Sequence, residues 1–126
     1  MDKEEIKLLD IQLIATVFYI VSLLISIFLT YNDKYKIINK KGMINDKNSN
    51  NLSIFNRTLV LILTIVFLYI SFKNQKIAQK KGNDLNPFKL QIAASELSVI
   101  SALIVLYVVI TSGEYSIIAG AENPNL

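Results

Sequence analysis

The sequence predicts an all-α integral membrane protein with three transmembrane helices, of which the second and third form an antiparallel hairpin. Three observations predict this fold. The 126 residues are 52% hydrophobic and only 18% charged, whereas a soluble domain carries about a quarter charged residues. The apolar residues are gathered in long blocks rather than scattered, which is typical of membrane spans. Lysines lie beside these blocks, where positive charge borders a membrane helix.

The first predicted helix covers about residues 4–31. Asp2 and Glu5 fit a capping box at the start of a helix. Residues 11–30 then carry no charge over about 20 positions, which is enough to cross the hydrocarbon core at about 1.5 Å per residue. The acidic start and the lack of a small-residue cleavage site lead us to interpret this block as a retained anchor rather than a signal peptide.

Residues 32–53 are predicted to form the first loop. The segment holds five lysines, a glycine at position 42 and the polar tract NDKNSNN at residues 45–51. A tract of this composition has too few apolar side chains to bury a core, so we expect it to be mobile.

The second predicted helix covers about residues 54–81. Its uncharged run, residues 58–72, is short for a membrane span, so we expect apolar residues before the run to extend it. Arg57 is then an interfacial anchor whose guanidinium reaches toward the head groups. Gly82 is expected just past the end of the helix, because glycine readily adopts the left-handed conformation that often ends a helix.

The third predicted helix covers about residues 87–112. Asn86 and Pro87 fit a helix start, since Asn is a frequent cap and Pro suits the first turn. The loop that joins the second and third helices is then about five residues long, which is usual for helix pairs. Residues 113–126 form a tail whose apolar part is too short to cross the membrane again, so we interpret residues 1–126 as a single membrane domain.

The distribution of Lys and Arg predicts how the protein sits in the membrane. With three spans, the N-terminus and the second loop share one side and hold seven of these residues, while the opposite side holds six. The tail has neither Lys nor Arg, which favours an inside N-terminus and an outside C-terminus in the cytoplasmic membrane. A near-equal number of Lys and Arg on the two sides is also expected of a dual-topology protein. We prefer the interpretation that the numbers are close because the first loop happens to be rich in lysine. The richness in Ile, Asn and Lys indicates an AT-rich, bacterial genome.

Glu96 is a carboxylate inside the third apolar run, where a charge is costly and points to a functional role. In one interpretation, Glu96 couples transport to protons or cations. In the interpretation that we prefer, it lies near the head groups and forms a salt bridge with Lys73 of the second helix. Lys89, seven residues back on the same helix face, is a second possible partner.

Small residues recur at helical spacing in the third helix, at Ala94, Ser98 and Ala102. Such a stripe allows helix backbones to approach closely. A weaker stripe, which contains Ser22 and Ser26, lies in the first helix. We prefer packing within the chain as the role of these stripes, with packing against a second copy or another membrane protein as the alternative.

The chain has no Cys and no His, which excludes disulfides, the common zinc sites and Ser-His-Asp triads. Glu96 and Ser98 are two residues apart, on opposite sides of a helix, and make no catalytic pair. We therefore predict no enzymatic activity, no cofactor, no metal and no small-molecule ligand. The net charge of +3 lacks the basic, aromatic-interleaved stripe of nucleic-acid binders, so the expected partner is the lipid bilayer.

A resemblance to a known group of proteins rests on several strings in the second half of the chain: Phe55-Asn56-Arg57, Lys76-Ile77-Ala78, Lys81-Gly82, Leu85, Pro87, Leu90-Gln91-Ile92-Ala93-Ala94-Ser95 and Ala102-Leu103-Ile104-Val105-Leu106-Tyr107. On these strings the chain resembles small membrane proteins of clostridia and related Firmicutes that have no assigned function. The resemblance covers a little under half of the chain. It implies a helical membrane protein and brings no activity, ligand or site.

Three functions fit these observations. The first is a non-enzymatic accessory or interaction protein, such as a subunit, an immunity-type protector or an envelope factor. The second is a small transporter or ion-coupled carrier that uses Glu96 and assembles as an oligomer, since three helices do not enclose a pathway alone. The third, a holin-like pore former, ranks last because the sequence ends in an acidic rather than a basic tail.

Overall fold

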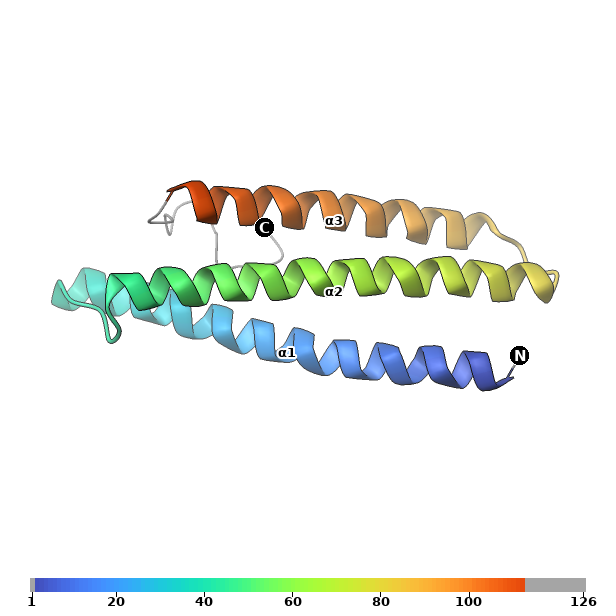
Figure 1. Cartoon of the computed structure of the whole chain (residues 1–126), viewed down its shortest axis with the longest axis horizontal. Helices are drawn as coiled ribbons and strands as arrows, with labels where there is room; N and C mark the ends of the chain where they lie inside the picture. Colours follow the sequence, from blue (N-terminus) through green and yellow to red (C-terminus); the bar gives the residue numbers. More distant parts are fainter. Residues whose placement is uncertain (1, 113–126) are drawn as a thin grey trace.

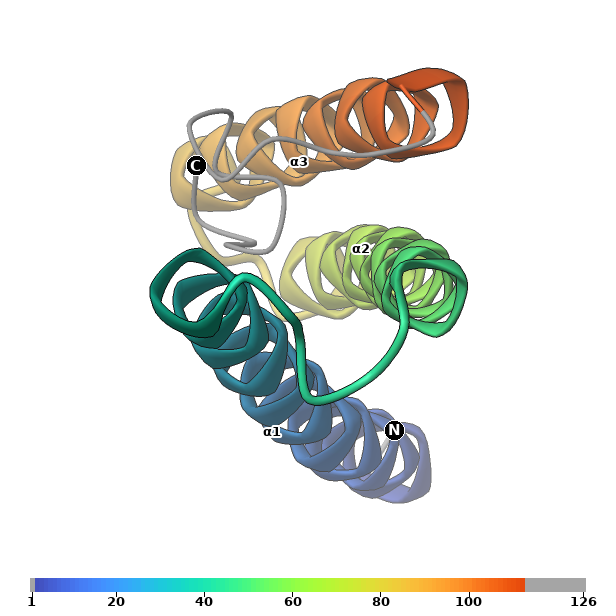
Figure 2. The same ribbon diagram turned by 90° about the vertical axis from the view of Figure 1, so that its left-hand side faces the viewer.

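The protein is a bundle of three long helices in the computed structural model, which describes residues 2–112. The helices are α1 (Asp2–Asn39), α2 (Asp46–Lys80) and α3 (Asn86–Ser112), and the described residues contain no strand. Helix α2 lies in the middle and runs antiparallel to both α1 and α3 (Figure 1). Seen end-on in Figure 2, α1 and α3 flank α2, and nearly all close contacts between helices involve α2. The predicted all-α fold and the predicted hairpin are confirmed.

Each of the three helices is long and apolar enough to cross a membrane. Their outer faces expose large apolar side chains, among them Leu13, Ile27, Leu103 and Tyr107. Such side chains match the acyl chains of a bilayer, where apolar helix surface needs no further cover. Backbone groups in the spanning region are bonded within each helix, as the bilayer requires.

The first loop is much shorter than the sequence predicted, because α1 continues to Asn39 and α2 begins at Asp46. Only residues 40–45 connect them. Lys40 has a φ of 59°, a left-handed conformation just beyond the end of α1. The predicted loop boundaries of 32 and 53 thus lie inside helices, and the tract expected to be mobile forms the cap and first turns of α2.

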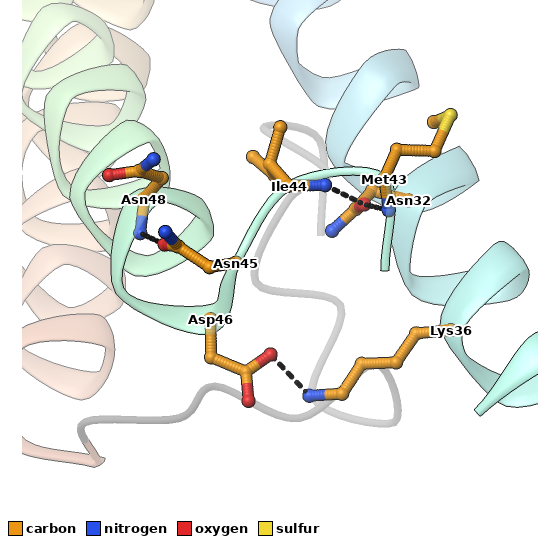
Figure 3. Close-up of polar contacts among 7 residues, drawn as sticks. All are labelled: Asn32, Lys36, Met43, Ile44, Asn45, Asp46 and Asn48. Carbon is orange, nitrogen blue, oxygen red and sulfur yellow. Dashed lines mark hydrogen bonds and ion pairs between the residues drawn. The ribbon is translucent and has the colours of Figure 1, made fainter. Parts of the chain in front are cut away.

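Asparagine side chains order this loop (Figure 3). Asn45 caps α2, with its side-chain oxygen accepting from the backbone N–H of Asn48 at 2.7 Å. Buried Asn32 accepts from the backbone N–H groups of Met43 at 2.8 Å and Ile44 at 3.3 Å. These bonds satisfy backbone donors that a chain reversal otherwise leaves unpaired.

The second loop follows the predicted pattern. Gly82 has a φ of 73°, and its N–H donates to the carbonyl of Gln79 at 3.2 Å. The N–H of Asn83 donates to the carbonyl of Ala78 at 3.0 Å, so the end of α2 is a Schellman motif. The third helix begins at Asn86, one residue before its predicted start. The predicted tail, residues 113–126, lies outside the described residues.

The contact between α1 and α2 repeats every seven residues. Leu8, Ala15, Ser22 and Leu29 are all buried on α1. Residues seven apart in a helix lie close to one face, so these buried side chains line one side of α1. Helix α1 crosses α2 obliquely, as the end-on view in Figure 2 shows.

Candidate functional site: a polar seam and the cleft beside Arg57

Polar side chains are buried where the second half of α1 faces the first half of α2. We call this set the polar seam. Its members are Ser22, Ser26, Asn32 and Asp33 from α1, and Ser49, Ser53, Asn56 and Arg57 from α2. Polar groups that are removed from water are stable only when hydrogen-bonded, so their geometry decides what the seam does.

Asn56 is the centre of the seam and is fully buried, at 0% exposure. Its side-chain oxygen accepts from the hydroxyl of Ser22 at 2.7 Å. Its side-chain nitrogen donates to the hydroxyl oxygen of Ser26 at 2.9 Å. Ser22 and Ser26 are one turn apart on α1, so a single amide joins two successive turns of the neighbouring helix.

One hydroxyl pair links α2 to α3. The Oγ atoms of Ser71 and Ser95 lie 3.1 Å apart, and Ser71 also bonds the carbonyl of Phe67 in its own helix. Along its length, α3 buries apolar side chains such as Ile92, Ala102 and Val109.

Ion pairs fix both ends of the α1–α2 contact. Lys36 and Asp46 lie 2.7 Å apart beside the first loop (Figure 3). At the other end of the bundle, Glu5 and Lys81 lie 2.7 Å apart. Both pairs are partly exposed, so each contributes less than about 1 kcal/mol.

Arg57 is buried between the helices, with only 2% of its surface exposed. The sequence placed its guanidinium among the head groups as an interfacial anchor. The structure differs, because Arg57 lies in the polar seam on a face of α2 that packs inward. The anchoring role predicted for Arg57 assumed that its guanidinium is exposed to the head groups. That role stays a prediction, and the burial of Arg57 does not support it.

A cleft of about 570 Å³ lies beside Arg57 and is bordered by all three helices. We call it the Arg57 cleft. The described residues that line it are Tyr19 from α1; Arg57, Val60, Thr64 and Phe67 from α2; and Ser95, Leu97, Ser98, Ser101, Ala102 and Val105 from α3. Among these residues, Arg57 is the only charged one.

Glu96 lies on the outer side of α3, exposed and away from α2. Within residues 2–112 it forms no ion pair, so the structure does not bring it together with Lys73 or Lys89. Lys73 instead lies over the ring of Tyr69, with its Nζ 5.7 Å from the ring centroid. The reason is rotational: Ser95 faces α2, and the next residue of a helix points about 100° away from it.

The predicted packing stripe of α3 is only partly used. Ala102 is buried against the bundle, whereas Ala94 and Ser98 are exposed. The Ser98 hydroxyl donates to the carbonyl of Ala94 at 3.0 Å within the helix. The stripe of α1 that looked weaker in the sequence is the one that packs, since both Ser22 and Ser26 are buried.

The polar seam was not predicted from the sequence, although the sequence contains a signal for it. Ser49, Asn56, Leu63, Ile70 and Ile77 are all buried and are seven residues apart. The helical period of the apolar run therefore continues backward into the polar tract. Composition hid this period, because serine and asparagine occupy the positions that leucine and isoleucine occupy farther along.

The fold and these contacts define a class: a small three-helix membrane protein whose helices are joined by hydrogen bonds inside the spanning region. Among residues 2–112 there is no group of acidic, His or Cys side chains that would hold a metal ion. No protein-family model, curated protein or solved structure matches the chain. The function is therefore inferred from the chain itself.

Proposed function

We propose that the chain works by contact within the membrane, as a non-enzymatic accessory or interaction protein such as a subunit, an immunity-type protector or an envelope factor. The observation that carries the proposal is how the buried polar groups are used. Asn56 bonds Ser22 and Ser26, and Ser71 lies against Ser95. These groups join helices to one another, whereas catalysis needs paired polar groups directed at a substrate.

An exposed stripe of small residues on α3 supports this proposal. Ala94 and Ser98 are exposed and one turn apart, on the side of the helix opposite Glu96. A small-residue surface lets a neighbouring helix approach closely, and in lipid such close packing is a main source of helix association. The partner is a second copy of the chain or another membrane protein. The resemblance to small Firmicutes membrane proteins is part of this proposal and implies a helical membrane protein, with no activity attached.

Cysteine crosslinking in native membranes tests the contact, because the chain has no Cys of its own. We expect Ala94→Cys to crosslink into a species of one defined larger mass. Val17→Cys, which is 60% exposed on α1, is the matched control and is expected to stay monomeric. The proposal is dropped if neither variant crosslinks and the protein remains a lone monomer after gentle detergent extraction.

The proposed location is the cytoplasmic membrane, with the N-terminus inside. Exposed Lys41 and Asn83 lie in the two loops, on opposite sides of the membrane. We expect a membrane-impermeant maleimide to label Lys41→Cys but not Asn83→Cys in intact cells. Labelling of Asn83→Cys alone would reverse the orientation, and partial labelling of both would indicate dual topology.

An oligomeric transporter that uses Glu96 is the second candidate. The observation in its favour is the exposure of this carboxylate on α3, where another chain, rather than this bundle, would have to cover it. Transport in proteoliposomes by wild type but not by Glu96→Gln would support it. Equal transport by both proteins would remove Glu96 from the mechanism.

A further inference from the structure

A second, smaller pocket lies at the end of the bundle that holds the second loop. The start of α1, the end of α2, the loop and the start of α3 all contribute to its lining. Its volume is about 240 Å³, somewhat below the range of about 300–1,000 Å³ that is usual for drug-sized ligands. We call it the Glu5–Lys81 pocket, after the two charged residues in its described lining. Its size suits a compact polar group.

The depth of this pocket matches the head-group layer of a bilayer. On α1 its lining extends from Gln12, at the start of the uncharged run of residues 11–30, to Glu5. Glu5 is six residues before that run, which is about 9 Å along the helix axis. The head-group layer adds about 5–8 Å on each side of the hydrocarbon core. The pocket therefore covers the depth at which lipid phosphates and ester groups lie.

The two charges of the pocket can exchange partners. Glu5 and Lys81 form an ion pair at 2.7 Å, and their side chains are 32% and 41% exposed. Among residues 2–112 neither side chain has another ion pair or a hydrogen bond. A pair this exposed contributes little stability, so separating the two groups costs little when a ligand satisfies both. Since the pair has no net charge, it matches a ligand that carries one charge of each sign.

Three amide side chains lie in the same lining: Gln12, Asn74 and Asn83. None of them forms a side-chain hydrogen bond among the described residues. An amide presents two N–H donors, whereas the phosphate and ester oxygens of a lipid are acceptors. The pocket thus offers unused donors at the depth where a lipid presents acceptors.

From these observations we infer that the Glu5–Lys81 pocket binds the head group of one phospholipid that carries a primary ammonium, as phosphatidylethanolamine does. The phosphate lies against Lys81, and the ammonium donates to the carboxylate of Glu5. The acyl chains remain in the bilayer beside Leu9, which lines the pocket and is 58% exposed. This site goes beyond the proposed contact function and does not depend on it, since the pocket belongs to the single chain.

Native mass spectrometry of the purified full chain tests the site, with dioleoyl phosphatidylethanolamine and dioleoyl phosphatidylcholine as probes. We expect wild type to retain one phosphatidylethanolamine and to prefer it to phosphatidylcholine by about tenfold, the ratio that one hydrogen bond to a charged group gives. Glu5→Gln is expected to remove this preference, because it removes the charged acceptor. Asp46→Asn breaks the ion pair of equal length at the other end of the bundle and is the matched control, which should keep the preference.

A second measurement keeps the test decisive if Glu5→Gln does not fold, which circular dichroism shows. It uses wild type alone and compares dioleoyl lipids whose ammonium carries zero, one, two or three methyl groups. We expect retention to fall along this series and to be lowest for phosphatidylcholine, because each methyl group replaces one N–H donor.

Four outcomes would overturn the proposal. Equal retention across the methylated series by wild type would show that the N–H donors of the head group are not recognised. Stronger retention of dioleoyl phosphatidylglycerol would show that the protein selects an anion. An equal loss of preference in Asp46→Asn would show that the preference does not arise at this pocket. Displacement of the lipid by millimolar phosphoethanolamine would show that the pocket takes a soluble zwitterion rather than a lipid.

Discussion

Helix α2 packs against two neighbours in two different ways. Its contact with α1 contains the polar seam, with Asn56 bonded to two serines and ion pairs at both ends. Its contact with α3 is mainly apolar and holds one hydroxyl pair. In a bilayer, lipid tails are as apolar as leucine, so apolar burial alone does little to choose one helix neighbour over another.

The difference between the two contacts shows which of them is specified by directional side-chain bonds. The α1–α2 seam is directional, because the amide of Asn56 meets both serines at only one rotation and one register. The α2–α3 contact has less directional information, and its register is set largely by the short loop that ends α2 at Gly82. We therefore expect substitutions in the seam to cost more than those at the α2–α3 contact.

The largest expected effect is that of Asn56→Ala. This change removes both hydrogen bonds to α1 and leaves a cavity, so we expect a loss of about 2–3 kcal/mol in the free energy of unfolding. The measurement is an SDS titration in mixed micelles followed by circular dichroism. Gln79→Ala, exposed near the end of α2, is the control and should change stability by less than about 0.5 kcal/mol.

Leucine substitutions compare the two small-residue stripes directly. Ser22→Leu places a large side chain at a position with 0% exposure, which we expect to cost about 1–3 kcal/mol through overpacking. Ser98→Leu adds the same atoms to the exposed face of α3 and should be within about 0.5 kcal/mol of wild type. The same titration measures both. An equal cost for the two variants would mean that α3 packs on a face other than the one described.

Asn32→Ala tests the polar end of the α1–α2 contact. The change removes the acceptor of the Met43 and Ile44 amides, and we expect a loss of about 1 kcal/mol. Hydrogen exchange of these two amides should become faster. Asn39→Ala, which removes an exposed bond to Tyr35, is the control and should leave their exchange unchanged. Unchanged exchange in Asn32→Ala would show that the loop does not depend on this side chain.

The smallest expected effect is that of Ser71→Ala, at about 0.6 kcal/mol, a typical value for one hydrogen bond between membrane helices. A double-mutant cycle with Ser95→Ala should give a coupling energy of that size. The matching cycle of Asn56→Ala with Ser22→Ala should give a larger one. The comparison between the two contacts fails if the serine pair couples as strongly as the seam.

The number of helices and the hairpin were predictable because they depend on features that the sequence shows directly. Long uncharged runs mark the spans, and Gly82 marks the turn, since its positive φ favours glycine. The ends of the first loop were not predicted, because polar composition was read as a lack of structure. Asn32 and Asn45 instead bond the backbone there, so the same composition helps to order the turn.

The environment of Glu96 could not be predicted from the sequence for a different reason. Its depth could be estimated by counting residues from the loop, but its rotation about the axis of α3 depends on which side chains meet α2. The Ser71–Ser95 pair fixes that rotation, and nothing local to Glu96 indicates it. Arg57 illustrates the same limit, because its burial depends on which face of α2 packs inward.

On the side of the first loop, helices α1 and α2 extend beyond their apolar runs. The run of α1 ends near residue 30, but the helix continues to Asn39, about 13 Å farther. This is more than the head-group layer, which adds about 5–8 Å on each side of the hydrocarbon core. With the apolar runs in a bilayer, the extended ends of the two helices would place Lys40 and Lys41 beyond the head groups. A protein that docks on those lysines must approach through water, whereas one that docks on α3 must diffuse in the plane of the bilayer.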